Sequence, residues 1–190
     1  MAKRIFKAGN ILTGSRLFVG MFAFAMLFNI QQIRAQNKPA LEYQVKAAFL
    51  YNFTRFVSWP SSAFNSSTAP FVIGIVGRDP FGSYLEDVID QEKVDEHPIV
   101  VQRYRDVKDI NNCQILYIPA GDDDKIKEVI SAVAHQNVLT VSDADKFVNW
   151  GGVISFFKED NKLRVQINIA AAKAAGVEIS SKLLKISKIR

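Results

Sequence analysis

The residues Phe71-Val-Ile-Gly-Ile-Val76 form a continuous apolar run that ends at Gly77. A short apolar run without polar alternation predicts a strand buried on both faces, as strands of parallel sheets are. Comparable runs follow at 99–101, 113–118 and 138–141. The centre of the chain therefore predicts four buried strands.

Helical patterns lie between these runs. Asp79-Pro80 is typical of a helix start and predicts a helix to about Asp90, and Gly121-Asp-Asp-Asp124 precedes apolar residues at helical spacing (Ile126, Val129, Ile130 and Val133). Strands that alternate with helices favour a parallel sheet with right-handed crossovers. We expect an α/β fold with a mainly parallel central sheet flanked by helices.

The C-terminal part has a different pattern. Residues 153–157 and 163–169 flank the polar segment Lys158-Glu-Asp-Asn-Lys162, which predicts an antiparallel hairpin. The closing segment 170–189 is rich in Ala and Leu and predicts a helix broken near Gly176.

An aromatic helix is predicted over residues 41–59, ended by Pro60. Its apolar face is expected to hold Val45, Phe49, Phe53 and Phe56, with Leu50 and Val57 widening it. Cys113 is the only cysteine, and its apolar neighbours predict a buried side chain rather than a reactive thiol.

The basic charge of the chain is concentrated at its start. The net charge is +5 over 190 residues, and residues 1–35 hold five of the 24 basic residues and no acid. The remainder has 24 − 5 = 19 basic and 19 acidic residues. Because binding to phosphates needs a surplus of Lys and Arg, nucleic acid is not an expected partner.

The same segment predicts a secretory signal peptide over residues 1–35. Basic residues precede the 14-residue apolar run 17–30, and Ala35 offers a cleavage site. Residues 36–190 would then form a single exported domain in the periplasm. An uncleaved membrane anchor is the alternative, although Arg16 and Arg34 bracket so short a run.

Motifs for catalysis or metal binding are missing from the sequence. The chain has two histidines, neither in a metal-site or triad spacing, and it lacks the common Zn²⁺ and hydrolase motifs. Asp122, Asp123 and Asp124 are expected to stabilise a helix N-terminus rather than to bind a cation. We expect no catalytic residue, no metal and no cofactor.

Two arginines are candidates for binding an anion. Arg55 lies one turn after Tyr51 and four residues before Trp59, and Arg164 shares one strand face with Gln166. A guanidinium beside aromatic rings can bind a carboxylate or phosphate. The sequence therefore suggests a ligand pocket between the first helix and the hairpin, with ordinary solvated charges as the alternative.

The C-terminal segment is a candidate partner surface. Leu183, Leu184, Ile186 and Ile189 exceed what one face of a short helix buries, and basic residues that include Lys185 and Lys188 surround them. This pattern suits an acidic partner surface or lipid headgroups. Docking of the helix onto the sheet is the competing interpretation.

Several motifs, in order, resemble the YfiR family of periplasmic proteins across nearly the whole chain after residue 36. They are residues 43–60 (Tyr43-Gln-Val-Lys to Ser58-Trp-Pro60), Gly77-Arg-Asp-Pro-Phe81, Gly151-Gly-Val-Ile-Ser-Phe156, Leu163-Arg-Val-Gln-Ile-Asn168 and Ile179-Ser-Ser-Lys-Leu-Leu184.

The resemblance implies an exported α/β domain that represses a membrane diguanylate cyclase by binding its periplasmic region. It also implies that Arg55 and Arg164 border a small-ligand pocket, although Gln166 stands where the family has a histidine. The family repressor is disulfide-bridged, whereas here Gly74 replaces the expected thiol of the first strand and leaves Cys113 without a mate.

We therefore expect a non-enzymatic, exported regulatory protein that modulates a membrane signalling protein. A periplasmic module that binds a small anionic ligand without a protein partner is the alternative. An enzyme of unrecognised type is a third class, and homodimer formation is left open by the sequence.

Overall fold

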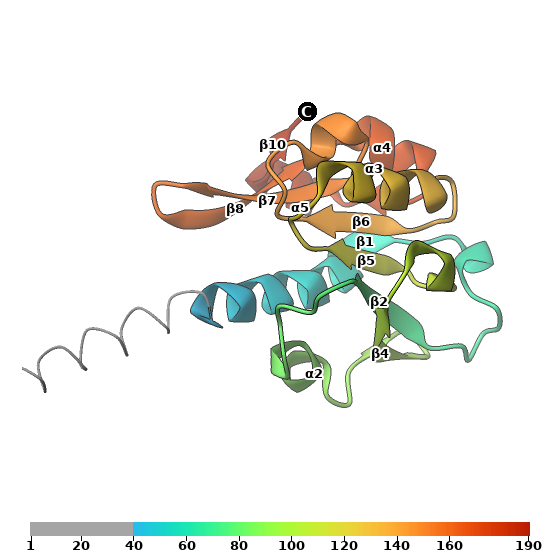
Figure 1. Cartoon of the computed structure of the whole chain (residues 1–190). Helices are drawn as coiled ribbons and strands as arrows, with labels where there is room; N and C mark the ends of the chain where they lie inside the picture. The colour runs from blue at the N-terminus through green and yellow to red at the C-terminus, as the bar shows by residue number, and fades with distance from the viewer. Residues whose placement is uncertain (1–39) are drawn as a thin grey trace, which may run out of the picture. The chain divides into compact units, whose positions relative to one another are not determined.

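An eight-stranded sheet runs through the centre of the protein (Figure 1). The computed structural model describes residues 40–190, so the predicted signal peptide lies outside the described residues. The sheet order is β10-β8-β7-β6-β5-β2-β4-β3. The strands are β2 (Phe71–Val76), β3 (Lys93–Val94), β4 (His97–Tyr104), β5 (Ile115–Ile118), β6 (Leu139–Ser142), β7 (Ile154–Glu159), β8 (Lys162–Ile167) and β10 (Lys188–Ile189).

The middle of the sheet is parallel. Strands β4, β2, β5, β6 and β7 pair in parallel, and β7 and β8 form the antiparallel hairpin. All residues of β2, β5 and β6 are buried, as expected of strands covered on both faces. The predicted α/β class, with a mainly parallel sheet and a C-terminal hairpin, is confirmed.

Helices cover both sheet faces. They are the N-terminal helix (residues 40–56), α2 (Tyr84–Ile89), α3 (Asp123–Ala132), α4 (Ile169–Ala174) and α5 (Ser181–Ile186), with short 3₁₀ turns η1 (Ser61–Ala63), η2 (Val107–Asp109) and η3 (Phe147–Trp150). The N-terminal helix, α2, α4 and α5 pack on one apolar core, and α3 and η3 pack on the other. The Asp122 carboxylate accepts from the amides of Asp124 and Lys125, which confirms its capping role.

The order of the strands reverses once in this sheet. The chain passes from β2 to its neighbour β4, and then returns across β2 to β5 on the other side. From β5 it continues outward through β6 and β7. The loops after β2 and β5 therefore leave the carboxyl edge in opposite directions, which opens a crevice between them.

The N-terminal helix differs from its prediction. It ends at Phe56 rather than at Pro60, because Val57–Ser58 become strand β1 and pair with β9 (Glu178–Ile179) in a separate two-stranded sheet. The buried face of the helix also differs from the predicted face, which included Val45. Val45 is 39% exposed, whereas Lys46 is only 2% exposed.

The C-terminal segment is not one broken helix. Gly176, with φ +72°, separates α4 from β9, and α5 follows β9 before β10 joins the edge of the large sheet. Among the described residues, no helix combines the length and apolarity needed to cross a bilayer.

Cys113 and Gly74 lie next to each other in the apolar core that α3 and η3 cover. Cys113 is 4% exposed, as predicted, and burial raises the pKa of its thiol to about 12. A Cβ atom placed on Gly74 would lie 3.4 Å from the Cβ of Cys113 and 2.6 Å from the Tyr104 ring. Glycine is therefore required at this position by the close approach of Tyr104.

Candidate functional site

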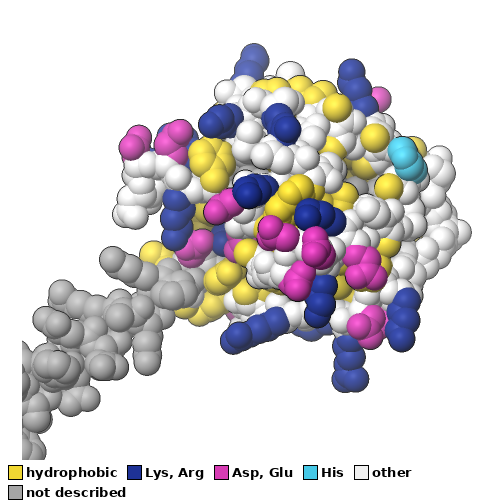
Figure 2. All heavy atoms as spheres, turned by 45° about the horizontal axis from the view of Figure 1, so that its top comes forward, with side chains coloured by type: hydrophobic (Ala, Val, Ile, Leu, Met, Phe, Trp, Pro, Cys, Tyr) yellow, Lys and Arg dark blue, Asp and Glu magenta, His cyan; other side chains and the backbone are white. Residues whose placement is uncertain are grey.

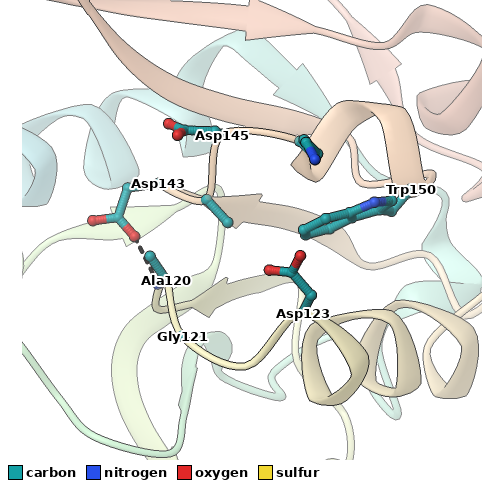
Figure 3. A pocket seen from close by; sticks show the side chains of 8 residues that line it. Ala120, Gly121, Asp123, Asp143, Asp145 and Trp150 are labelled. Carbon is teal, nitrogen blue, oxygen red and sulfur yellow. Dashed lines mark hydrogen bonds between the residues drawn. The ribbon is translucent and has the colours of Figure 1, made fainter.

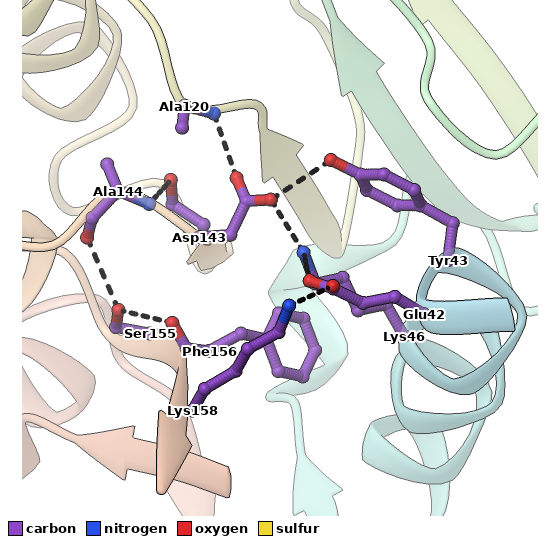
Figure 4. Close-up of polar contacts among 10 residues, drawn as sticks. Glu42, Tyr43, Lys46, Ala120, Asp143, Ala144, Ser155, Phe156 and Lys158 are labelled. Carbon is purple, nitrogen blue, oxygen red and sulfur yellow. Dashed lines mark hydrogen bonds and ion pairs between the residues drawn. The ribbon is translucent and has the colours of Figure 1, made fainter. Parts of the chain in front are cut away.

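A buried ion-pair network joins the N-terminal helix to the carboxyl edge of the sheet (Figure 4). The Lys46 ammonium lies 2.7 Å from Asp143 and 2.8 Å from Glu42, and Glu42 also pairs with Lys158 at 2.6 Å. The Tyr43 hydroxyl and the backbone amide of Ala120 donate to the two oxygens of Asp143, at 3.2 and 2.9 Å. Asp143 follows β6 directly, so the network ties this strand end to the helix.

The network keeps its central groups charged. Burial alone would raise the pKa of Asp143, but the hydrogen bond and charge of Lys46, together with the Ala120 amide, hold it below its usual range. Burial alone would lower the pKa of Lys46, but its bonds to Asp143 and Glu42 more than offset this effect and raise it. The network therefore holds oppositely charged groups of the helix and of the strand end in contact.

One polar atom beside the network has no partner. The hydroxyl of Tyr117 is buried and forms no hydrogen bond within the described part of the chain. Burial and the nearby Asp143 carboxylate raise the pKa of Tyr117. The tyrosine therefore stays protonated and packs edge-on against Phe81, with ring centroids 4.7 Å apart.

A small acidic hollow of about 310 Å³ lies on the outer side of Asp143 (Figure 3). Asp123, Asp143 and Asp145 contribute carboxylates to its lining, and Trp150 closes one side. Over residues 40–190, no group of three or more Asp, Glu, His or Cys side chains has the arrangement needed to hold a metal ion. The hollow does not define a metal centre.

The structure does not bring Arg55 and Arg164 together. Arg55 is exposed and lies beside Tyr51, whose hydroxyl donates to Glu92 near the β3 end of the sheet. Arg164 lies in β8, near the opposite end of the sheet. Its neighbour Val165 faces the N-terminal helix, so strand alternation directs Arg164 to the other sheet face.

Arg55 does not line the groove that Arg164 lines, so this groove is not the expected pocket shared by both arginines. Trp59 has a packing role in this structure, because its indole donates to the Gln114 carbonyl at 3.1 Å and its ring meets Phe71 edge-on. Gln166 is half-buried in β8 and lies in register with Lys188 of β10.

A groove of about 300 Å³ instead joins Arg164 to the C-terminal segment, and we call it the C-terminal groove. It is lined by Phe157, Glu159, Arg164 and Val165 of the hairpin and by residues 185–188. Lys188 lies over the Phe157 ring, 5.7 Å from its centroid, and Arg164 is 4.0 Å from Glu159. Arg164, Lys185 and Lys188 thus face one groove, with Glu159 as the single acid of its lining.

The apolar residues predicted for the partner surface divide into two groups. Leu183 is 3% exposed and belongs to the core, and Leu184 packs partly against the same core. Ile186 and Ile189 are 67% and 45% exposed. The docking interpretation therefore holds for Leu183, while Ile186 and Ile189 leave an apolar rim beside the C-terminal groove.

Charged groups of both signs are interspersed over the face displayed in Figure 2, which shows acidic side chains beside basic ones rather than a continuous basic area. This pattern agrees with the equal numbers of basic and acidic residues after residue 35. Such a surface does not suit a polyanion.

Sequence reasoning missed the Lys46–Asp143 pair. Lys46, Leu50, Phe53 and Val57 recur at helical spacing, so Lys46 occupies a buried position of the helix. A lysine within the apolar face of a helix indicates that an acidic residue is buried beside it. This pattern in the sequence could have predicted a partner for Lys46. Asp143 directly follows an apolar strand, a position that lies at the carboxyl end of a parallel sheet.

The chain belongs to the YfiR/HmsC-like family, whose family model matches residues 43–188. The match begins at Tyr43 in the N-terminal helix, includes every strand from β1 to β9, and ends at Lys188, the first of the two residues of β10. It confirms the family to which the sequence motifs point. A search of curated proteins found no match to this chain.

Proposed function

We propose that this protein is an exported, non-catalytic regulator that binds the periplasmic domain of a membrane signalling protein, such as a diguanylate cyclase. Membership of the YfiR/HmsC-like family over residues 43–188 is the observation that carries this proposal. The saturated Lys46–Asp143 network and the lack of a metal-ligand cluster in residues 40–190 agree with a binding role.

The C-terminal groove and its rim are the proposed contact surface. Ile186 and Ile189 are exposed apolar side chains on or beside the edge strand β10, and Lys185 and Lys188 flank them. Interfaces depend on a few apolar anchors, and rim charges steer the encounter. The matching partner surface is apolar at its centre and acidic at its border.

The test compares a charge-reversed variant with a matched control. Lys185→Glu/Lys188→Glu changes two groove lysines, and Lys93→Glu/Lys173→Glu changes two exposed lysines elsewhere. Binding to purified periplasmic domains of the membrane diguanylate cyclases of the same cell is measured by biolayer interferometry. We expect the groove variant to lose binding at unchanged melting temperature, and the control to retain it.

Equal binding by both variants would remove the C-terminal groove from the contact surface. Binding of none of the cyclase domains would contradict the proposed partner class. Sedimentation of the protein alone addresses the homodimer, because self-association lost in the groove variant would assign this surface to a second copy instead.

Export is tested separately. The proposal expects a periplasmic protein that begins at or near Gln36, and intact-mass measurement of the protein from the periplasmic fraction checks this. A chain that retains residues 1–30 in its native compartment would identify the leader as an anchor.

A further inference from the structure

We propose that the crevice between the loops after β2 and β5, which we call the switch crevice, binds a small organic anion that has an apolar body. Its volume of about 550 Å³ lies within the range of roughly 300–1,000 Å³ that small-molecule sites occupy. It shares no lining residue with the C-terminal groove, so this inference is independent of the proposed partner surface.

The topology places the crevice where open α/β sheets bind ligands. The chain steps from β2 to β4 on one side and then to β5 on the other, so the two loops diverge at the carboxyl edge. In open parallel sheets, ligands lie outside the carboxyl ends of the strands at this reversal of strand order. Gly77 and Gly121 line the opening, and no atom lies within 4 Å of a Cβ placed on either glycine.

Basic side chains from several segments meet in the switch crevice. Arg78 follows β2, Arg105 and Lys108 follow β4, and Lys125 belongs to α3. None of the four forms an ion pair in the part of the chain that the structure describes, in contrast to Lys46, Arg103 and Lys158. Guanidinium groups without a carboxylate partner are suited to a carboxylate or a phosphate ester.

Two of the three acids in the crevice lining are engaged with the backbone. Asp122 accepts from the amides of Asp124 and Lys125 in the first turn of α3, and Asp106 belongs to the capping box of η2. Because Asp122 already engages two amides of the first turn of α3, this helix end contributes little to binding the anion. The arginine and lysine side chains must therefore supply the contacts, and Glu128 is the one acid left to oppose them.

The floor of the switch crevice is apolar. Val76, Ile118, Ile126 and Val129 line it, and each is at most 8% exposed. An inorganic ion alone would leave this floor uncovered. An aromatic or aliphatic body attached to the anionic group would cover it, and that burial adds to the affinity.

The experiment uses phenyl phosphate as the probe and records amide NMR shifts of the ¹⁵N-labelled protein during titration. We expect saturable shifts at Gly77, Arg78 and Gly121, with weaker binding of inorganic phosphate and of benzyl alcohol. Arg78→Gln/Arg105→Gln removes two charges and should weaken phenyl phosphate at least tenfold. The control Lys93→Gln/Lys173→Gln changes two exposed lysines outside the crevice and should bind as the unmodified protein does.

A second variant tests the location without removing charge. Gly121→Leu projects a side chain into open space and should block phenyl phosphate while leaving the melting temperature unchanged. The proposal is overturned if phenyl phosphate gives no saturable shifts, if benzyl alcohol binds equally well, or if either crevice variant binds as tightly as the unmodified protein.

Discussion

Lys46 and Asp143 join two segments that lie 97 residues apart in the sequence, and their side chains are only 2% and 15% exposed. Removing one member of a buried pair leaves the other charge without compensation, whereas removing both can be nearly neutral. The pair is therefore the residue-scale contact whose loss we expect to cost most.

Replacing Lys46 tests this expectation. Lys46→Ala should lower the free energy of unfolding by about 3–5 kcal/mol, because Asp143 stays buried without its counter-charge. Lys46→Met/Asp143→Asn should cost clearly less. Urea denaturation measures both, with Lys158→Ala as the control, since Lys158 is 61% exposed and its pairing with Glu42 is worth about 0–1 kcal/mol.

Lys46→Ala losing no more stability than Lys158→Ala would contradict the assigned role of the pair.

The Lys46–Asp143 pair also predicts that the stability of the folded protein depends on pH. The folded pKa of Asp143 lies below the value of 3.8 for a free carboxyl, and that of Glu42 is also lowered from 4.5. The unfolded chain therefore binds more protons as the pH falls, so this stability is present above about pH 5 and is lost progressively below it. Denaturant midpoints across about pH 3–6 should fall with decreasing pH in the unmodified protein.

The fall should be shallower in Lys46→Met/Asp143→Asn, which lacks the Asp143 carboxylate. Identical slopes in the two proteins would show that other acids govern the acid sensitivity.

Cys113 gives a residue-scale prediction about redox conditions. Burial raises the pKa of its thiol to about 12, so little thiolate forms near neutral pH. Reductant should leave the melting temperature unchanged, and a thiol reagent should label the native protein far more slowly than the unfolded protein. Rapid labelling of the native protein, or a dimer that reductant separates, would contradict the buried assignment.

At the scale of the element, α5 carries two apolar residues with opposite surroundings. Leu183 is 3% exposed and Ile186 is 67% exposed, three positions later in the same helix. Leu183→Ala should cost about 2–5 kcal/mol, as large-to-small changes in cores do. Ile186→Ser should change the free energy of unfolding by less than about 0.5 kcal/mol and should weaken partner binding.

Chemical denaturation checks the two stabilities side by side. A large loss of stability in Ile186→Ser would show that this side chain supports the fold and is not free to meet a partner.

The strands could be predicted from the sequence where burial on both faces makes the pattern continuous. Runs such as Phe71–Val76 are short and rich in Val and Ile, which favours a strand over a helix, and the hairpin is marked by its polar turn at 158–162. The strands missed were β1, β3, β9 and β10, each two residues long. Such short strands form only because they pair with segments distant in the sequence, so no local sequence pattern predicts them.

Candidate site residues were predicted less well for a related reason. Strand alternation correctly placed Arg164 and Gln166 on one face, but which face lies under the N-terminal helix depends on packing across the sheet. The meeting of Arg164 with Lys185 and Lys188 needs β10 to pair with β8, a contact between distant segments. Sequence periodicity contains no information about such long-range pairing.

At the scale of the whole molecule, the hollows lie along separate stretches of one sheet. The switch crevice and the acidic hollow share Ala120 and Gly121 at the carboxyl edge, while the C-terminal groove is formed by the hairpin and β10. Asp143 lines the acidic hollow and also holds the N-terminal helix. A ligand at the carboxyl edge and a partner at the C-terminal groove would therefore contact different parts of one sheet.

The closeness of Gly74 to Cys113 has a consequence in genetic terms. A glycine codon becomes a cysteine codon by one nucleotide change for two of the four glycine codons, and the new Cβ would lie 3.4 Å from that of Cys113. This spacing is close to the range of about 3.5–4.5 Å found across disulfides. The Tyr104 ring, 2.6 Å from the same position, would have to move first. Where Gly74 is encoded by one of these two codons, a single point mutation would place a second cysteine beside Cys113, and the Tyr104 ring is the steric obstacle to a covalent cross-link between β2 and the segment before β5.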